Sequence, residues 1–132
     1  MTKKFPFKAA LIIGVWAHLL AGAALREVVV SHTDDQGVLQ LYRMKEDGTG
    51  SRQLTFSKTG CRMPSCSSDG KKLVYVEQVG HAMALRLADL NGGKVRTLVG
   101  EGMNMLPSWL PDSEHLIWMK VKPQPKQDPA RN

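Results

Sequence analysis

From residue 28 onward, short runs of apolar residues alternate with polar, turn-forming residues. The runs are rich in β-branched and aromatic residues, as is typical of strands. They are VVV (28–30), VLQLYRM (38–44), RQLT (52–55), KKLVYVEQ (71–78), AMALRLADL (82–90), VRTL (95–98) and HLIWMK (115–120). Between them lie Asp47-Gly48, Asp69-Gly70, Asn91-Gly92 and Asp112-Ser113, pairs that tolerate the positive φ of tight hairpins. These turns leave no room for a long amphipathic helix. The pattern predicts an all-β chain of short antiparallel strands.

The chain contains an internal repeat. PSCSSDGKKLVYV begins at Pro64, and PSWLPDSEHLIWM begins at Pro107, 43 residues later. LYRMKEDGTGSRQLT, from Leu41, aligns without gaps on LRLADLNGGKVRTLV, from Leu85. Four short antiparallel strands in a period of about 43 residues are typical of a β-propeller blade.

Both motifs resemble the TolB-type propeller repeat, a WD-like family whose blades read P-S-W-S-P-D-G and later R-x-L-T. The likeness covers roughly residues 28–119. Cys66 stands where the pattern has Trp, which implies a smaller contact between blades. Ser68 replaces Pro, and Ser113 replaces Gly, which makes that hairpin less ideal. We interpret the motif residues as turn formers and core fillers: Pro64, Ser65, Asp69, Gly70, Pro107, Ser108, Trp109 and Asp112, with turns at Asp47, Gly48, Asn91 and Gly92.

The repeat domain, residues 26–120, enters in the middle of a blade and holds about two and a half blades. A closed propeller needs at least four, so we expect an incomplete, open propeller. Its uncovered face would be covered by a protein partner or by a second copy in a homo-oligomer, or would disappear in a sandwich-like rearrangement. We favour a protein partner, because an uncapped repeat array exposes apolar surface and unpaired strand edges.

Residues 1–25 have the plan of a secretory signal peptide. Lys3, Lys4 and Lys8 precede about 17 uncharged residues from Ala9 to Leu25. An uncleaved membrane-anchor helix is the alternative, with membrane contact through residues 9–25. Both predict a periplasmic domain, either soluble after cleavage or anchored in the inner membrane with the N-terminus cytoplasmic.

Candidate cofactor ligands are few. His18 follows Gly14 at a spacing that resembles bacteriochlorophyll-ligating helices, but an ordinary polar residue in a signal peptide is the favoured interpretation. We expect no cofactor and no metal. His32, His81 and His115 show no metal-binding spacing, and the acidic pairs Asp34-Asp35 and Glu46-Asp47 fit solvated turns better than a calcium site.

The net charge of +6 does not point to nucleic acid. Between Ala24 and Met119 there are 11 basic and 11 acidic residues, so the basic excess lies in the two ends of the chain. A nucleic-acid-binding protein concentrates its charge on a folded face. Residues 121–132 form a proline-rich basic tail that we expect to be disordered.

Cys61 and Cys66 are the chain's two cysteines, with four residues between them. An oxidising compartment would allow a disulfide. An extended segment would instead hold them about 16 Å apart, so both states remain open.

No nucleophile elbow, P-loop or dinucleotide fingerprint occurs in the sequence. We therefore expect an exported, non-catalytic TolB-like module that acts by protein–protein interaction at the periplasmic face of a bacterial membrane. The alternative is a single-span accessory subunit of an integral-membrane complex, such as a photosynthetic or other energy-transducing assembly, with its β-domain as a periplasmic cap.

Overall fold

The computed structural model describes residues 26–122. The signal or anchor segment, His18 and most of the proline-rich tail lie outside the described residues. Within residues 26–122 every regular element is a strand, which confirms the all-β prediction. This part of the chain has no helix long and apolar enough to cross a membrane.

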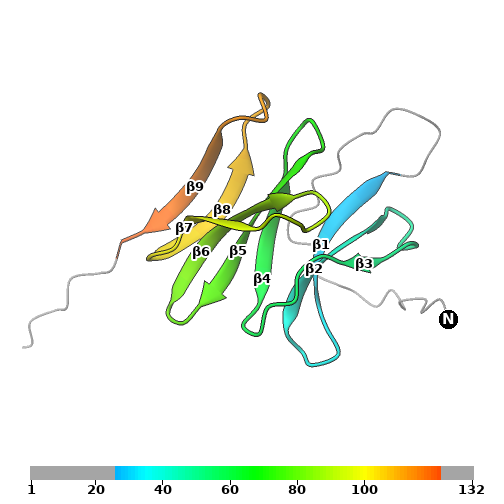
Figure 1. The fold of residues 1–132 in the computed structure, drawn as a ribbon, viewed down its shortest axis with the longest axis horizontal. Coiled ribbons are helices and arrows are strands. Elements are labelled where there is room, and N and C mark those ends of the chain that lie inside the picture. The colour runs from blue at the N-terminus through cyan, green and yellow to red at the C-terminus, as the bar shows by residue number, and fades with distance from the viewer. Residues whose placement is uncertain (1–25, 123–132) are drawn as a thin grey trace, which may run out of the picture.

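Nine strands follow one another in the described part of the chain (Figure 1): β1 (Glu27–Thr33), β2 (Leu39–Lys45), β3 (Arg52–Gln53), β4 (Cys61–Cys66), β5 (Lys72–Val79), β6 (Ala82–Asp89), β7 (Arg96–Val99), β8 (Met103–Trp109) and β9 (Leu116–Val121). They form a first unit, β1–β3, a second unit, β4–β7, and a third unit, the hairpin β8–β9. Neighbouring strands inside each unit are antiparallel. The third unit joins the second through one parallel pair, Met83 with Met103. This open arrangement is consistent with a partial propeller.

Strand β5 buries both of its faces. Successive side chains of a strand point to opposite sides of the sheet. Leu73 and Tyr75 join a core that the first unit completes with Val29 and Leu41. Val76 lies in a separate core on the opposite face. Burial on both faces explains why this segment reads as an unbroken apolar run.

The two copies of the Pro-Ser motif lie inside strands, β4 and β8. Neither strand was among the runs expected from the apolar pattern. Each strand contains a β-bulge, between Arg62 and Ser65 in β4 and between Met105 and Ser108 in β8. Proline is tolerated there because a bulge interrupts the ladder of hydrogen bonds.

The two bulges share a residue with positive φ at the same position. Met63 and Leu106, which precede the two prolines, have positive φ of 53° and 50°. This conformation is unusual for a bulky residue. The repeat therefore extends to the detailed backbone of the strands.

The four joints between runs are tight turns. The second residue of each has positive φ: 81° at Gly48, 70° at Gly70, 81° at Gly92 and 59° at Ser113. The backbone N–H of each of these residues donates to the carbonyl three positions earlier, which closes the turn. Ser113 adopts a positive φ, a conformation that is strained for a residue with a Cβ but not for glycine.

Candidate interaction surface

One face of the third unit is an exposed apolar surface. In β9 the side chains of Ile117, Met119 and Val121 are 57%, 50% and 43% exposed. Met103, which pairs with Val121 across the hairpin, is exposed beside them. Paired residues lie on the same side of a sheet. We call these four residues the β9 face.

The second unit contains the residues equivalent to Ile117 and Met119 of the β9 face, and there they are buried. In the second unit, β4 pairs Ser65 with Val74 and Arg62 with Val76. In the third unit, β8 pairs Ser108 with Ile117 and Met105 with Met119, 43 positions later in every case. The register of the two hairpins is therefore the same. Val74 and Val76 are fully buried, at 0% exposure, whereas their equivalents in the β9 face are open.

Within residues 26–122 the outer edge of β9 is also unpaired. β9 is the last strand of its sheet and pairs only with β8 among the described residues (Figure 1). An edge strand presents backbone N–H and C=O groups that can pair with another strand. Apolar surface and free backbone groups therefore lie on the same strand.

The third unit is held against the second by residues of the repeat motif. The Trp109 backbone N–H donates to Ser65 Oγ at 3.3 Å, and its indole N–H donates to the Ser65 carbonyl at 3.1 Å. The Lys72 ammonium lies 5.2 Å from the centre of the Trp109 ring and also donates to the Ser113 carbonyl at 2.8 Å. Ser65, Trp109 and the Asp112-Ser113 turn thus connect units as well as shaping them.

The Asn91-Gly92 turn has a similar role between the first and second units. Asn91 Oδ1 accepts from Arg43 at 2.6 Å and from Arg52 at 3.2 Å. Gly92 lies so close to Leu54 that an added Cβ would be 2.6 Å from the Leu54 carbonyl oxygen. The sequence predicted a turn here, but a contact with the preceding unit gives no local signal.

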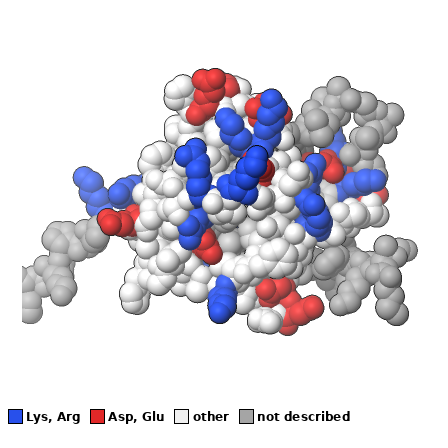
Figure 2. Space-filling model, in the orientation of Figure 1, with Lys and Arg blue, Asp and Glu red and all other residues white. Residues whose placement is uncertain are grey.

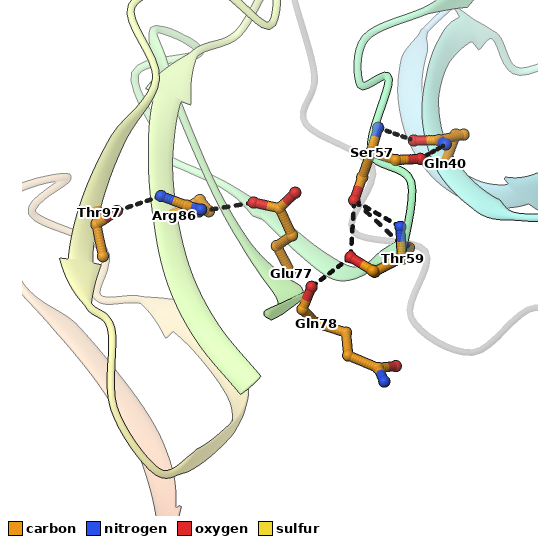
Figure 3. Close-up of polar contacts among 8 residues, drawn as sticks. Gln40, Ser57, Thr59, Glu77, Gln78, Arg86 and Thr97 are labelled. Carbon is orange, nitrogen blue, oxygen red and sulfur yellow. Dashed lines mark hydrogen bonds and ion pairs between the residues drawn. The ribbon is translucent and has the colours of Figure 1, made fainter. Parts of the chain in front are cut away.

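A cleft of about 360 Å³ lies where segment 54–57 meets the second unit. Tyr75 and Glu77 line it, with the exposed Phe56 at its margin. Glu77 accepts a hydrogen bond from Arg86 Nε at 2.7 Å, and Figure 3 shows this pair pointing toward each other across the sheet. Burial, together with Cys61 and Glu77, raises the pKa of Tyr75 to about 12. The charges of Glu77 and Arg86 therefore compensate each other in the cleft. Tyr75 is neutral there at neutral pH.

A buried glutamine supports the segment beside the cleft. Gln40 Nε2 donates to the Ser57 carbonyl at 2.6 Å, and Gln40 Oε1 accepts from the Ser57 backbone N–H at 3.1 Å (Figure 3). Gln40 Oε1 also accepts from Thr55 Oγ1 at 2.9 Å. A buried polar group is tolerated when its hydrogen bonds are satisfied.

Cys61 and Cys66 do not form a disulfide with each other in the structure. They lie at the two ends of β4, where Cys61 is opposite Glu77 and Cys66 is opposite Leu73. Burial raises the pKa of both thiols, that of Cys66 to about 11. The structure holds the two thiols along the extended strand β4, and whether they pair in the isolated protein stays a prediction.

The carboxylates of the turn residues Asp34 and Asp112 accept hydrogen bonds from backbone N–H groups. Asp34 Oδ1 accepts from the N–H groups of Gln36 and Val38, both at 2.9 Å, which lowers the Asp34 pKa. Hydrogen bonds from the backbone N–H groups of His115 and Glu114 lower the pKa of Asp112 to about 2. Among residues 26–122, no group of three or more His, Cys, Asp or Glu side chains could hold a metal ion.

Charged side chains of both signs share the surface. Figure 2 shows Lys and Arg side chains spread over one face of the molecule with Asp and Glu among them. The expectation that the domain does not bind nucleic acid stays a prediction.

No protein-family model matches the chain. An uncharacterized protein of Agrobacterium fabrum is 28% identical over 99 residues, which cover 66% of this chain and 34% of that protein. The chain thus spans about a third of the length of this curated relative. A solved structure of a proposed TolB from Agrobacterium tumefaciens matches with a TM-score of 0.56 and 25% identity, covering 72% of this chain and 39% of that one. TolB from Acinetobacter baumannii matches with a TM-score of 0.55 and 25% identity, covering 69% and 22%.

The fold is TolB-like. An acylaminoacyl peptidase from Pyrococcus horikoshii also matches, with a TM-score of 0.56, 18% identity and coverage of 78% of this chain and 16% of that one. At this identity the likeness concerns the fold alone. The solved structures therefore support a TolB-like β-repeat.

One departure from the TolB-type repeat adds a contact. Ser113, expected only to make its hairpin less ideal, accepts a hydrogen bond at its Oγ from the Asp69 backbone N–H at 2.9 Å. Glycine could not form this bond. The side chain thus joins equivalent turns of adjacent TolB-like units.

Proposed function

We propose that the chain is an exported, non-catalytic TolB-like β-repeat module that acts by binding a protein through the β9 face. The observation that carries the proposal is the contrast between equivalent residues, since Val74 and Val76 are fully buried while Ile117 and Met119 are half exposed. In the second unit Val76 packs against Met83 and Leu85 of β6, whereas the equivalent surface of the third unit is open. The TolB-like solved structures support the assignment to a β-repeat module.

Covering the β9 face would contribute to binding. Complete burial of a large aliphatic side chain stabilises by about 1.5–3 kcal/mol relative to full exposure. Because the residues of this face are about half exposed, a partner would gain about 1 kcal/mol from each. The four residues together supply the apolar centre of a modest interface, and polar contacts at its margin would set specificity.

The proposed site of action is the periplasmic face of a bacterial membrane. It rests on the basic start and the uncharged stretch of residues 1–25. The same stretch, if retained, supports the second candidate, a single-span accessory subunit of an integral-membrane complex whose β-domain acts as a periplasmic cap. The intact mass of the protein isolated from its own cells separates the two, because loss of about 23 residues excludes the anchored form.

Site-specific photo-cross-linking tests the contact. A photoreactive residue in place of Ile117 should form an adduct with a partner, and one in place of Gln36, an exposed residue between β1 and β2, should not. Met119→Asp should abolish the Ile117 adduct without unfolding the domain, because Met119 is half exposed. An adduct of twice the chain's mass would identify a second copy as the partner. Equal labelling at both positions, or none at Ile117, would exclude the proposal.

A further inference from the structure

The structure also indicates what kind of segment fits the edge of β9. We propose that this edge accepts an antiparallel strand from a partner protein, and that this strand carries an acidic residue opposite Trp118. The inference rests on the proposed function and specifies the chemistry of the partner.

The second unit provides the template for the added strand. There, β6 pairs with β5 and places Leu87 opposite Val74 and Leu85 opposite Val76. By the shared register of the two hairpins, a strand added to β9 would place alternate residues opposite Ile117 and Met119. Apolar residues at those two positions would continue the β9 face, as cross-strand pairs on one face do.

In the template strand β6, the position between Leu85 and Leu87 carries a charged residue, Arg86. Arg86 of β6 lies opposite Tyr75 and makes its ion pair with Glu77, the diagonal neighbour. The equivalents of Tyr75 and Glu77 in β9, 43 positions later, are Trp118 and Lys120. The acidic residue of β5 is therefore replaced by a basic one in β9.

This reversal changes which strand is accepted. Lys120 makes no ion pair among residues 26–122 and is exposed. A strand like β6 would bring an arginine next to Lys120, which is unfavourable. A strand with Asp or Glu at that position would restore the diagonal pair with inverted signs. The charges thus disfavour a β6-type strand from a second copy and favour a partner strand with an acidic residue flanked by apolar ones.

Strand addition itself has a physical basis. Main-chain hydrogen bonds from the free edge supply affinity, and side chains at alternate positions supply specificity. In β9 the specificity would come from Ile117 and Met119 on one face and from Trp118 and Lys120 on the other.

A tethered-strand experiment tests the inference on the full chain. The β6 sequence, AMALRLAD, is appended to the C-terminus through a Gly-Ser linker in one protein, and its Arg86→Glu version in another. Tethering gives the strand an effective concentration in the millimolar range. Hydrogen–deuterium exchange of segment 116–121, read by mass spectrometry, reports whether the edge is occupied. We expect the Glu version to protect this segment about threefold more than the Arg version, as one cross-strand charge pair would.

The matched control is Lys120→Glu in both proteins, which should reverse the order of protection. An order unchanged by Lys120→Glu, or no protection by either strand, would overturn the inference. If cross-linking from Ile117 still captures a partner in that case, the proposed function stands and only the strand chemistry is wrong. Loss of both signals would remove the proposed function as well.

Discussion

Trp109 donates its indole N–H to the backbone carbonyl of Ser65, 44 positions earlier in the chain and in the adjacent unit. The two residues belong to successive copies of the same motif. Two successive units of the repeat are therefore connected by a hydrogen bond between residues of their own motifs.

Trp109→Phe should weaken this joint. Phenylalanine keeps an aromatic ring but cannot donate to Ser65, so we expect the free energy of unfolding to fall by about 1 kcal/mol. Urea denaturation followed by circular dichroism measures the change. Trp118→Phe is the matched control, because the Trp118 indole makes no hydrogen bond among residues 26–122, and it should change stability by less than about 0.5 kcal/mol. Equal losses in the two variants would contradict the role of the hydrogen bond.

Gly92→Ala should destabilise more than Gly37→Ala. Both glycines have similar positive φ, 81° and 78°. A Cβ at Gly37 would meet nothing within 4 Å, whereas one at Gly92 would be 2.6 Å from the Leu54 carbonyl oxygen. We expect a loss of about 1 kcal/mol at Gly37 from the backbone alone and about 3 kcal/mol at Gly92, where the clash adds to it. Thermal unfolding of the two variants measures the difference, and equal melting temperatures would exclude close packing at this turn.

Asp112 should make stability depend on pH in the acid range. Its pKa in the folded protein is about 2, below the ordinary value of 3.8, because backbone N–H groups of His115 and Glu114 bind the carboxylate. A depressed folded pKa gives stability that is complete above the unfolded pKa and is lost as the pH falls from about 4 through about 2. Asp112→Asn should flatten that part of the profile.

The urea midpoint at about pH 5 and about pH 2.5 measures the Asp112 effect. Asp35→Asn is the control, since Asp35 makes no hydrogen bond among the described residues, and its profile should follow that of the unaltered protein. A profile of Asp112→Asn as steep as the unaltered one would refute the assignment.

Both thiols should react slowly in the folded protein. Burial raises the pKa of Cys61 and Cys66, so at neutral pH neither supplies much of the nucleophilic thiolate. An aromatic disulfide reagent should label the native protein slowly and label two thiols per chain after unfolding in urea. Failure to find two thiols after unfolding would show that the cysteines pair in the isolated protein.

The turns and the strands other than β4 and β8 could be predicted because their signals are local. Residues 71–78 and 82–90 are apolar runs bounded by turn formers, and the structure has β5 and β6 there. The Asp-Gly and Asn-Gly pairs predicted positive φ because few other residues accept it. These patterns need no information from distant parts of the chain.

The contacts between units could not be predicted in the same way. The sequence predicts Asn91 as a turn former, whereas its hydrogen bonds to Arg43 and Arg52 join residues far apart in the chain. The strands β4 and β8 were missed because Pro64 and Pro107 argue against a strand, and a bulge is what accommodates them. The repeat offset of about 43 residues was the available signal, since residues one period apart lie near each other in adjacent units.

The same offset limits the sequence separation of the residues that must come together during folding. The hydrogen bonds between described residues that join one unit to the next connect positions at most 48 residues apart, as in Arg43 with Asn91. The entropic cost of closing such loops grows only slowly with length. Each unit can therefore assemble on its immediate predecessor, and the folding rate should depend on the length of one period more than on the number of periods present.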